Sequence, residues 1–484
     1  MYKVNSPSGF YRKRAMSDQS SKPGNKNIYN APLEKAFSHI STPFEDFIHD
    51  EAMSGLVLMV CTIIALLAAN SFLAHTYENI LHAPVAVSIG GWELKHSIHH
   101  WINDGLMAMF FFVVGLEIKR EARVGELSDL RQALLPITAA FGGMIVPALI
   151  YFSITAGTDN TNGWGIPMAT DIAFAVGALV MLGNRIPKTL LTFLVALAIV
   201  DDLGAVVVIA VFYTENIAFG ALGIALLIFG MLWMLNLAGI RNPLPYFLLG
   251  GLMWLAMLYS GVHATLAGVL TALTIPSKPK YDPLFFSGRV RKLMDRFDAS
   301  HKPEISIIKN EQQRAILQTL ENVTFKIETP LQRLEHQLHV PVAFLVIPVF
   351  ALANAGIPIE FTSMADTLGH PVTLGVIIGL VAGKFIGIAG FSWLGLKLGL
   401  LRLPEGTSFS QVAGVALLGG IGFTMSIFIA ELAFVGQPEQ LLMAKTGILV
   451  ASISAGAAGF IWLRWFARPG QVRQNSEKKT QKTK

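Results

Sequence analysis

Four ionisable residues lie inside long apolar stretches of the sequence. They are Asp171, the adjacent pair Asp201 and Asp202, and Lys384. Placing an ionisable side chain at the centre of a membrane-spanning helix costs at least about 2.5 to 3.5 kcal/mol, so each of these residues requires a partner, a cavity or a function. Three acids against one base predict an acidic site.

The pair Asp201-Asp202 is the strongest candidate for chemistry. Neighbouring side chains on a helix project about 100° apart, so one carboxylate can face Lys384 while the other faces an open cavity. Two like charges in a medium of low dielectric favour proton uptake by one of them. Carboxylate oxygens suit hard cations, whereas softer metals prefer clusters of His or Cys. We therefore predict that Asp201 and Asp202 bind Na+ or Li+ and exchange it for protons; a purely structural ion pair is the alternative.

The composition identifies the environment of these charges. Of the 484 residues, 53% are hydrophobic and only 14% are charged, whereas soluble proteins carry about 25% charged residues. Of the 37 Lys and Arg residues, 7 lie before Glu51, 11 lie between Pro276 and Val340, and 7 lie from Arg464 onward. This distribution indicates a polytopic membrane protein whose partner is the lipid bilayer, not nucleic acid. The single cysteine, Cys61, excludes a disulfide within the chain.

Apolar stretches of roughly 17 to 25 residues are long enough to cross the hydrocarbon core as helices. About twelve candidates are present, so both termini are expected on the same side of the membrane. They lie at about 53–72, 101–118, 133–153, 166–182, 190–213, 217–239, 244–258, 261–275, 340–356, 372–396, 411–432 and 441–463. The expected fold is therefore an all-α transmembrane domain over 46–466.

The loops between these spans predict the orientation. Every second loop is basic, and the basic residues of this set include Lys119, Arg120, Arg123, Arg131, Arg185, Lys188, Arg241, Lys397 and Arg402. The alternate loops contain only Lys95. Because Lys and Arg accumulate in cytoplasmic loops, we expect a disordered cytoplasmic extension over 1–45 and a basic cytoplasmic tail over 467–484.

Two pieces of the chain are predicted to lie outside the membrane. In the segment 81–97, alternating apolar residues flank Gly90-Gly91, a pattern typical of a β-hairpin with a two-residue turn. A two-stranded hairpin is marginally stable alone, so it either lies on the membrane domain or pairs with a second copy in a homodimer. The segment 276–339 is expected to be a partly helical cytoplasmic loop.

Residues that break helices are concentrated in the fourth and eleventh spans, over 163–171 and 414–424. Each is the middle of a three-span group, spans 3–5 and spans 10–12, and the two groups have opposite topology. This pattern predicts an inverted repeat with two interrupted helices, the arrangement of a secondary transporter. Asp171 could then offset the positive N-termini of the half-helices, and Lys384 their negative C-termini. Close helix packing is the alternative explanation for the glycines.

From about Phe44 to Trp465 the sequence resembles the NhaA family of bacterial sodium/proton antiporters. The stretches that carry the resemblance are Trp101-Ile102-Asn103-Asp104-Gly105-Leu106-Met107-Ala108, Gly115-Leu116-Glu117-Ile118-Lys119-Arg120-Glu121, Ala169-Thr170-Asp171-Ile172-Ala173-Phe174, Ala198-Ile199-Val200-Asp201-Asp202-Leu203-Gly204, Ser260-Gly261-Val262-His263-Ala264-Thr265, Ala353-Asn354-Ala355-Gly356 and Gly420-Ile421-Gly422-Phe423-Thr424-Met425-Ser426.

The resemblance implies roles for the charged residues. Asp202 would be the principal cation ligand and proton carrier, with Asp201 beside it and paired with Lys384. Thr170 and Asp171 would lie where the two broken helices cross. The protein would be a transporter of the bacterial inner membrane and not an enzyme. It would export Na+ or Li+ in exchange for a larger number of external protons, with no cofactor.

The resemblance also implies regulation by pH through a cytoplasmic cluster. The expected members are Glu117, Arg120, Glu121 and Glu335, with His263 elsewhere on a span. The chain departs from the family pattern at Gln332, where the family usually has Lys, so one charge of the cluster is missing. The cytoplasmic segment 278–328 is longer than the family pattern, and the N-terminal tail is an extension.

Three other functions fit the residues less well. A sodium-coupled symporter for an organic anion would need more polar anchors than the apolar surroundings of Asp202 offer. A membrane enzyme using Mg2+ would need repeated acidic motifs with basic clamps for phosphate, but Asp201-Asp202 is not repeated. An ion channel would not explain the buried Lys384.

Overall fold

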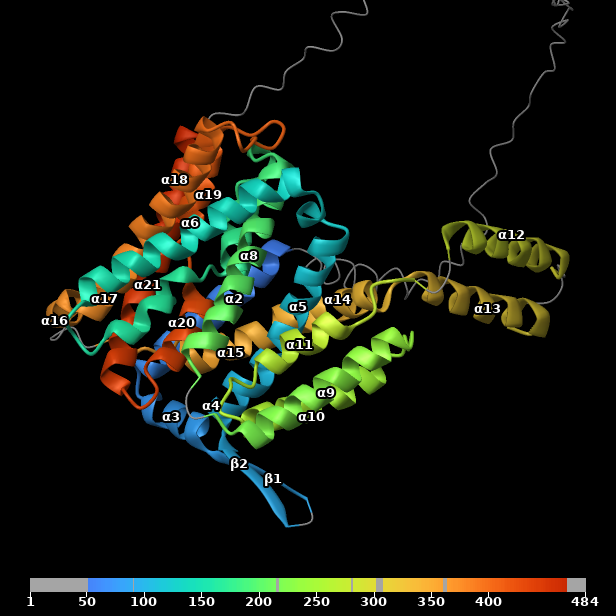
Figure 1. Cartoon of the computed structure of the whole chain (residues 1–484), viewed down its shortest axis with the longest axis horizontal. Coiled ribbons are helices and arrows are strands. Elements are labelled where there is room, and N and C mark those ends of the chain that lie inside the picture. Colours follow the sequence, from blue (N-terminus) through green and yellow to red (C-terminus); the bar gives the residue numbers. More distant parts are fainter. Residues whose placement is uncertain are drawn as a thin grey trace, which may run out of the picture. The chain divides into compact units, whose positions relative to one another are not determined.

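The computed structural model describes residues 51–89, 91–214, 217–279, 282–301, 308–359 and 364–467. These residues form helices and a single two-stranded sheet (Figure 1). Large apolar side chains face outward on several helices; on the helix Phe219–Leu237, for example, Leu226 is 57% and Met234 is 68% exposed. The predicted extension over 1–45 and all but the first residue of the predicted tail lie outside the described residues.

The α-helices are α2 (Glu51–Ala69), α3 (Ala74–His82), α4 (Ile98–His100), α5 (Met107–Arg123), α6 (Leu130–Thr155), α7 (Ile172–Val180), α8 (Lys188–Phe212), α9 (Phe219–Leu237), α10 (Leu244–Leu258), α11 (Leu266–Thr274), α12 (Pro283–Ala299), α13 (Glu311–Ile327), α14 (Pro330–Pro341), α15 (Ile347–Asn354), α16 (Met364–Gly369), α17 (Pro371–Ile378), α18 (Lys384–Lys397), α19 (Phe409–Leu418), α20 (Phe423–Ala433) and α21 (Pro438–Ile461). The π-helical turns are η1 (Trp101–Leu106), η5 (Val342–Val346), η6 (Gly379–Gly383) and η7 (Trp462–Phe466), and the 3-10 helices are η2 (Glu126–Ser128), η3 (Thr161–Met168) and η4 (Gly183–Arg185).

Within the described ranges, eight helices are long and apolar enough to cross a membrane, and two bent pairs raise the number to ten. The expected seventh span, 244–258, coincides with α10, whereas the expected eighth span, 261–275, is shorter than predicted because α11 has only 9 residues. At 1.5 Å per residue α11 is roughly 14 Å long, about half the thickness of the hydrocarbon core. The expected first span ends at Ala69, where α3 turns away by 110°. The fold is thus a polytopic helical membrane domain.

Both segments rich in helix breakers are interrupted helices. In the first, the backbone is extended at Ala169 and Asp171, between η3 and α7. In the second, α19 ends at Leu418 and α20 starts at Phe423, with a bend of 47° between them. The two breaks are in contact, because the amide of Asp171 donates a hydrogen bond of 2.7 Å to the carbonyl of Ile421.

Glycine allows α6 and α18 to pack against each other very closely. A Cβ atom added to Gly387 of α18 would collide with the backbone of Gly142 on α6, and one added to Gly142 would collide with the backbone of Gly387. Close approach of two backbones is the usual role of small residues between membrane helices. This crossing places Lys384, at the start of α18, inside the protein, where it is 0% exposed.

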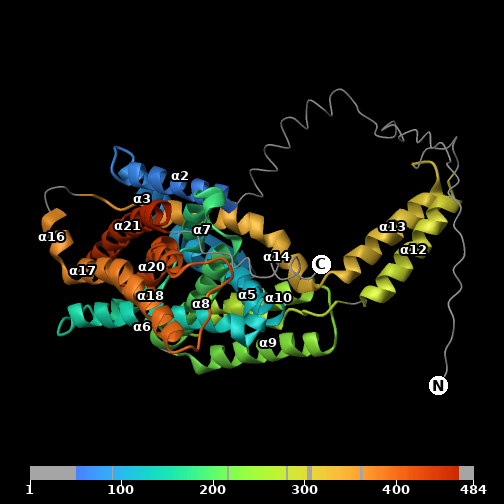
Figure 2. The ribbon, with the colours of Figure 1, turned by 90° about the horizontal axis from the view of Figure 1, so that it is seen from above.

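The predicted β-hairpin is present. Strand β1 (Pro84–Ile89) pairs with β2 (Trp92–Ser97) in antiparallel register, and Ile89 is opposite Trp92, so the turn has two residues. Gly91 in this turn has a φ of 90°, which glycine adopts without the steric cost that other residues incur. The long loop is partly helical, as expected, because α12 and α13 lie side by side in both views (Figures 1 and 2).

We predict that Gly387→Ala destabilises the protein by about 1 to 3 kcal/mol, because the added methyl group has no space against α6. Thermal unfolding in detergent measures the effect. Gly390→Ala is the matched control on the same helix, since a Cβ atom at Gly390 would meet no atom within 4 Å. Equal melting temperatures for the two variants would show that the α6–α18 crossing is not tightly packed.

Candidate cation site

Helix α8 carries both adjacent aspartates at its centre. Asp201 and Asp202 are each 1% exposed, although the rest of α8 is strongly apolar. Their side chains leave the helix in directions about 100° apart, and their surroundings differ accordingly. Asp201 is directed toward α18 and the first interrupted helix, whereas Asp202 lines a cavity.

Asp201 is held by two partners from other helices. Its Oδ2 lies 2.5 Å from Nζ of Lys384 and accepts a hydrogen bond of 2.8 Å from Oγ1 of Thr170. Nζ of Lys384 also donates to Thr170 Oγ1 at 3.0 Å. Burying one of these charges without the other would cost several kcal/mol, so the contact fixes α8 against α18. The structure therefore brings Asp201, Thr170 and Lys384 together.

Asp202 has the opposite environment. Within the part of the chain that the structure describes, neither of its carboxylate oxygens has a hydrogen-bond partner, although both are buried. The carboxylate lines a cavity of about 330 Å3 that also reaches Asp171 and Thr424. A buried carboxylate without a partner is unfavourable while ionised. Asp202 is therefore suited to binding a cation or a proton that enters this cavity.

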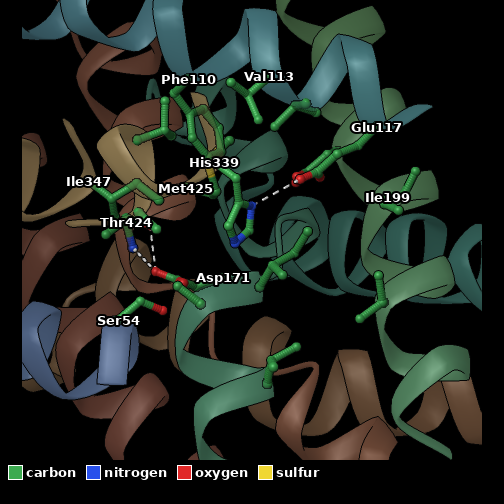
Figure 3. A pocket seen from close by; sticks show the side chains of 18 of the residues that line it. Ser54, Phe110, Val113, Glu117, Asp171, Ile199, His339, Ile347, Thr424 and Met425 are labelled. Carbon is green, nitrogen blue, oxygen red and sulfur yellow. Dashed lines mark hydrogen bonds and ion pairs between the residues drawn. The ribbon is translucent and has the colours of Figure 1, made fainter. Parts of the chain in front are cut away.

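Asp171 lies where the two interrupted helices cross. Its Oδ1 caps α7 by accepting a hydrogen bond of 3.1 Å from the amide of Phe174. Its Oδ2 accepts from the amide and the hydroxyl of Thr424, at 3.0 and 2.5 Å, in the first turn of α20 (Figure 3). The N-termini of two half-helices thus share one carboxylate, which offsets the partial positive charge of both.

Among the described residues, Nζ of Lys384 forms hydrogen bonds with Thr170 and Asp201 and with no carbonyl at the C-terminus of a half-helix. It reaches α19 through Thr170, whose Oγ1 lies 2.9 Å from the carbonyl oxygen of Gly419 and can donate to it or to Asp201. The single hydroxyl thus links α8, α18 and the second break. The expectation that Lys384 offsets the negative helix ends stays a prediction.

Most of the predicted pH-sensing residues form a cluster beside the cavity. Arg120 lies 2.9 Å from the carboxylates of both Glu121 and Glu335. Nδ1 of His339 lies 3.8 Å from Glu117, and Figure 3 shows this pair beside the cavity. Glu117, Arg120, Glu335 and His339 all line the cavity that contains Asp202. Charges in this cluster can therefore influence which ions enter.

His263 does not lie in this cluster. Its Nδ1 contacts Oγ1 of Thr265 at 2.7 Å, and its Nε2 lies 3.6 Å from the carboxylate of Asp104. His100 also contacts Asp104, at 3.0 Å. The ring of His263 packs edge-on against Phe428. Its surroundings are thus those of a hydrogen-bonded histidine in a packed helix contact.

Sequence reasoning gave no role to two residues that the structure places in polar contacts. Thr424 supplies two of the donors to Asp171. Lys445 forms an ion pair of 2.6 Å with Glu431, and both side chains are largely buried. Lys445 lies within the expected span 441–463, so the cost of its charge was the signal that could have found this pair.

Comparison with known proteins agrees with this geometry. The family model described as Na+/H+ antiporter 1 matches residues 45–463. The chain belongs to this family. It is 54% identical over 430 residues to Na+/H+ antiporter NhaA 1 of Saccharophagus degradans. This alignment covers 89% of this chain and 93% of the relative. It is 56% identical over 438 residues to Na+/H+ antiporter NhaA of Sulfurimonas denitrificans. This alignment covers 90% of this chain and 98% of the relative.

The function and location of the protein follow from this membership. The protein is a Na+/H+ antiporter, that is, a secondary transporter rather than an enzyme. Its long apolar helices make it a multi-pass protein of the bacterial inner membrane. The ions that the antiporter exchanges are its substrates, not resident cofactors.

We predict that Lys384→Met destabilises the antiporter by about 3 to 5 kcal/mol, because it leaves Asp201 buried without its cation. The double variant Lys384→Met/Asp201→Asn should recover much of this loss, since no unpaired charge remains. Thermal unfolding in detergent gives the unfolding free energies of the wild type, the two single variants and the double variant, which together form a double-mutant cycle. Lys397→Met, at the other end of α18, is the matched control and should combine additively with Asp201→Asn. Additive effects in the first cycle would contradict the pairing.

Proposed function

We propose that the antiporter exports Na+ or Li+ in exchange for external protons, and that Asp202, with Asp201 beside it, binds both. The observation that carries this proposal is the pair of buried Asp202 oxygens, which find no partner among the described residues and face a cavity. Oδ1 of Asp201 is also buried without a partner in the same part of the chain. These three oxygens are the ligands that we assign to the cation, and hard cations prefer such ligands.

Competition at these carboxylates couples the two ions. A cation and a proton each neutralise Asp202, so binding of one disfavours binding of the other. Asp201 differs because Lys384 already neutralises it. If cation binding opens this ion pair, Lys384 loses the carboxylate that favours its charged form and can release its own proton, so more than one proton can be released for each Na+. Exchange would then be electrogenic, with the membrane potential contributing about 2.3 kcal/mol per net charge for every 100 mV.

Alternating access requires that the site opens to each side in turn. The proposed architecture is twelve spans with an inverted repeat, in which spans 3–5 correspond to α6, η3 with α7, and α8. Spans 10–12 correspond to α17 with α18, α19 with α20, and α21. Contacts between α6 and α18 and between the two breaks support this pairing of the groups. The short α10 and α11 would complete the twelve, since a helix surrounded by protein need not span the bilayer.

The proposed orientation has both termini in the cytoplasm. It follows from the basic loops, and it places Glu117, Arg120, Glu121 and Glu335 at the cytoplasmic mouth of the cavity. Regulation by pH would then act where Na+ enters. Protonation of a carboxylate in this cluster would weaken its pairing with Arg120 and alter the charge that an entering cation meets. His263, in its separate position, is the second proposed sensor.

We also propose that the β-hairpin pairs two copies into a homodimer on the periplasmic side. The sheet has only two strands, so within the described residues each strand has one edge without a partner. Val85 and Val87 are 42% and 43% exposed on β1. Unpaired edges with exposed β-branched residues favour pairing with another strand.

We predict that Asp202→Asn abolishes exchange while the protein remains folded in the membrane, because an amide neither binds Na+ as a carboxylate does nor carries the proton. The measurement is Na+-induced collapse of a preformed pH gradient in vesicles containing the purified protein. Asp159→Asn, at an exposed position outside the cavity, is the matched control and should behave as the wild type. Retained exchange in Asp202→Asn would exclude Asp202 as the carrier.

We predict that the Na+ concentration for half-maximal exchange rises as pH falls, because protons and Na+ compete for the carboxylates. In the range where they compete, the rise should be about tenfold per pH unit for each proton displaced. Initial rates driven by a Na+ gradient, with equal pH on both sides, provide this slope. A slope near one identifies Asp202 alone, and a slope near two adds a proton released from the Asp201–Lys384 pair. A half-maximal concentration that does not depend on pH would contradict the shared site.

A further inference from the structure

The helix pair α12–α13 carries a basic groove that the transport site does not use. The groove has a volume of about 230 Å3. Arg289, Lys292 and Arg296 of α12 line it on one side. Ala315, Ile316 and Thr319 of α13 line it on the other. Since every ionisable residue in this lining is a cation, the groove favours an anion.

The three cations form one stripe along α12. They are spaced three and four residues apart, so they project from the same face of the helix. All three are exposed, and within the described residues none forms an ion pair with a carboxylate. Phe285, four residues before Arg289, extends the same stripe and is 51% exposed. Basic residues and aromatic rings are both common on helices that lie on a membrane surface.

The groove charges do not hold the two helices together. The contact between α12 and α13 is made by other residues, of which Leu293 is 7% and Val323 is 4% exposed. Side-chain amides add hydrogen bonds: Asn310 donates to the carbonyl of Ser300 at 2.8 Å, and Gln313 to that of Phe297 at 3.2 Å. Removing the three positive charges should therefore leave the helix pair folded.

The membrane is close to this groove because both ends of the helix pair are tethered to it. Only residues 275–282 separate α11 from α12, and only residues 328–329 separate α13 from α14. Eight residues reach at most about 28 Å when fully extended. Helix α14 begins the candidate span Pro330–Asn354. These short connections keep the helix pair near the membrane, so α12 can reach the bilayer surface.

We propose that the groove binds the phosphate headgroups of anionic phospholipids in the adjacent leaflet, which anchors α12 to the membrane surface. Arginine and lysine pair well with phosphate oxygens, and each basic residue near an anionic surface strengthens binding about fivefold, the equivalent of about 1 kcal/mol. Phe285 then lies at the boundary between headgroups and acyl chains. This proposal needs only a membrane protein, so it holds or fails independently of the ion site.

The test uses the full-length protein in neutral detergent, with an environment-sensitive fluorophore on Ser287→Cys in a Cys61→Ser background. Short-chain phosphatidylglycerol is the probe, and phosphatidylcholine and inorganic phosphate are titrated separately. The variant is Arg289→Gln/Lys292→Gln/Arg296→Gln. The matched control, Arg291→Gln/Lys309→Gln/Arg314→Gln, removes three charges from α12, from α13 and from the connection between them, all outside the groove lining. Na+/H+ exchange in phosphatidylcholine vesicles checks that both variants are folded.

We expect phosphatidylglycerol to change the fluorescence at concentrations where phosphatidylcholine does not. The groove variant should weaken this binding about a hundredfold, and the control variant should leave it within a few-fold of the parent protein. No response to phosphatidylglycerol, or an equal response to phosphatidylcholine, would overturn the proposal. An equal response to inorganic phosphate would assign the groove to a free anion instead. An equal loss of phosphatidylglycerol binding in the control variant would show that the net charge of the helix pair, and not a specific site, attracts the lipid.

Discussion

The buried contact between Lys384 and Asp201 is the constraint on which the rest of the site depends. Both side chains are excluded from solvent, so each charge is tolerable only while the other is in place. Lys384 reaches this position because glycines let α18 approach α6 closely. The same contact includes Thr170. One ion pair therefore determines where α8, α18 and the first interrupted helix lie relative to each other.

The three buried aspartates differ in how fully the protein satisfies them. Asp171 accepts hydrogen bonds from the N-terminal turns of two half-helices and serves the backbone. Asp201 binds a cation and a hydroxyl through one oxygen, and its other oxygen has no hydrogen-bond partner in the part of the chain that the structure describes. Asp202 has no partner among the described residues. A carboxylate that the protein leaves unsatisfied gains most from binding an ion, which supports the role in transport proposed for Asp202.

The sequence predicted the features that depend on strong local signals. The Gly-Gly turn set the register of the hairpin, and the helix breakers marked both interruptions. The cost of charge in an apolar span identified the four ionisable residues, and adjacency on a helix indicated that Asp201 and Asp202 would face different surroundings. Each of these signals is a property of a few neighbouring residues.

Features that depend on contacts distant in sequence were not predictable in the same way. Apolar composition alone suggested that α11 crosses the membrane. Its nine residues are instead mostly buried by neighbouring helices. Composition could not distinguish the two cases, because burial in protein and burial in lipid favour the same residue types. The pairing of Glu431 with Lys445 joins α20 to α21. The basic groove needs the packing of α13 against α12. Such arrangements are properties of packing, which hydrophobic patterns do not encode.

The crossing of the two breaks explains why a transporter can tolerate irregular backbone inside a membrane. Each break leaves backbone groups without helical partners, and lipid cannot supply any. Here each break supplies partners for the other: the amide of Asp171 donates to Ile421, and the hydroxyl of Ser426 donates to Ile166 at 2.8 Å. Separating the breaks would expose all of these groups at once. The two breaks must therefore move together, and α8 follows them because Thr170 is bonded to Asp201. In the proposed mechanism, a cation site on α8 would move with the two breaks while the surrounding helices change which side has access.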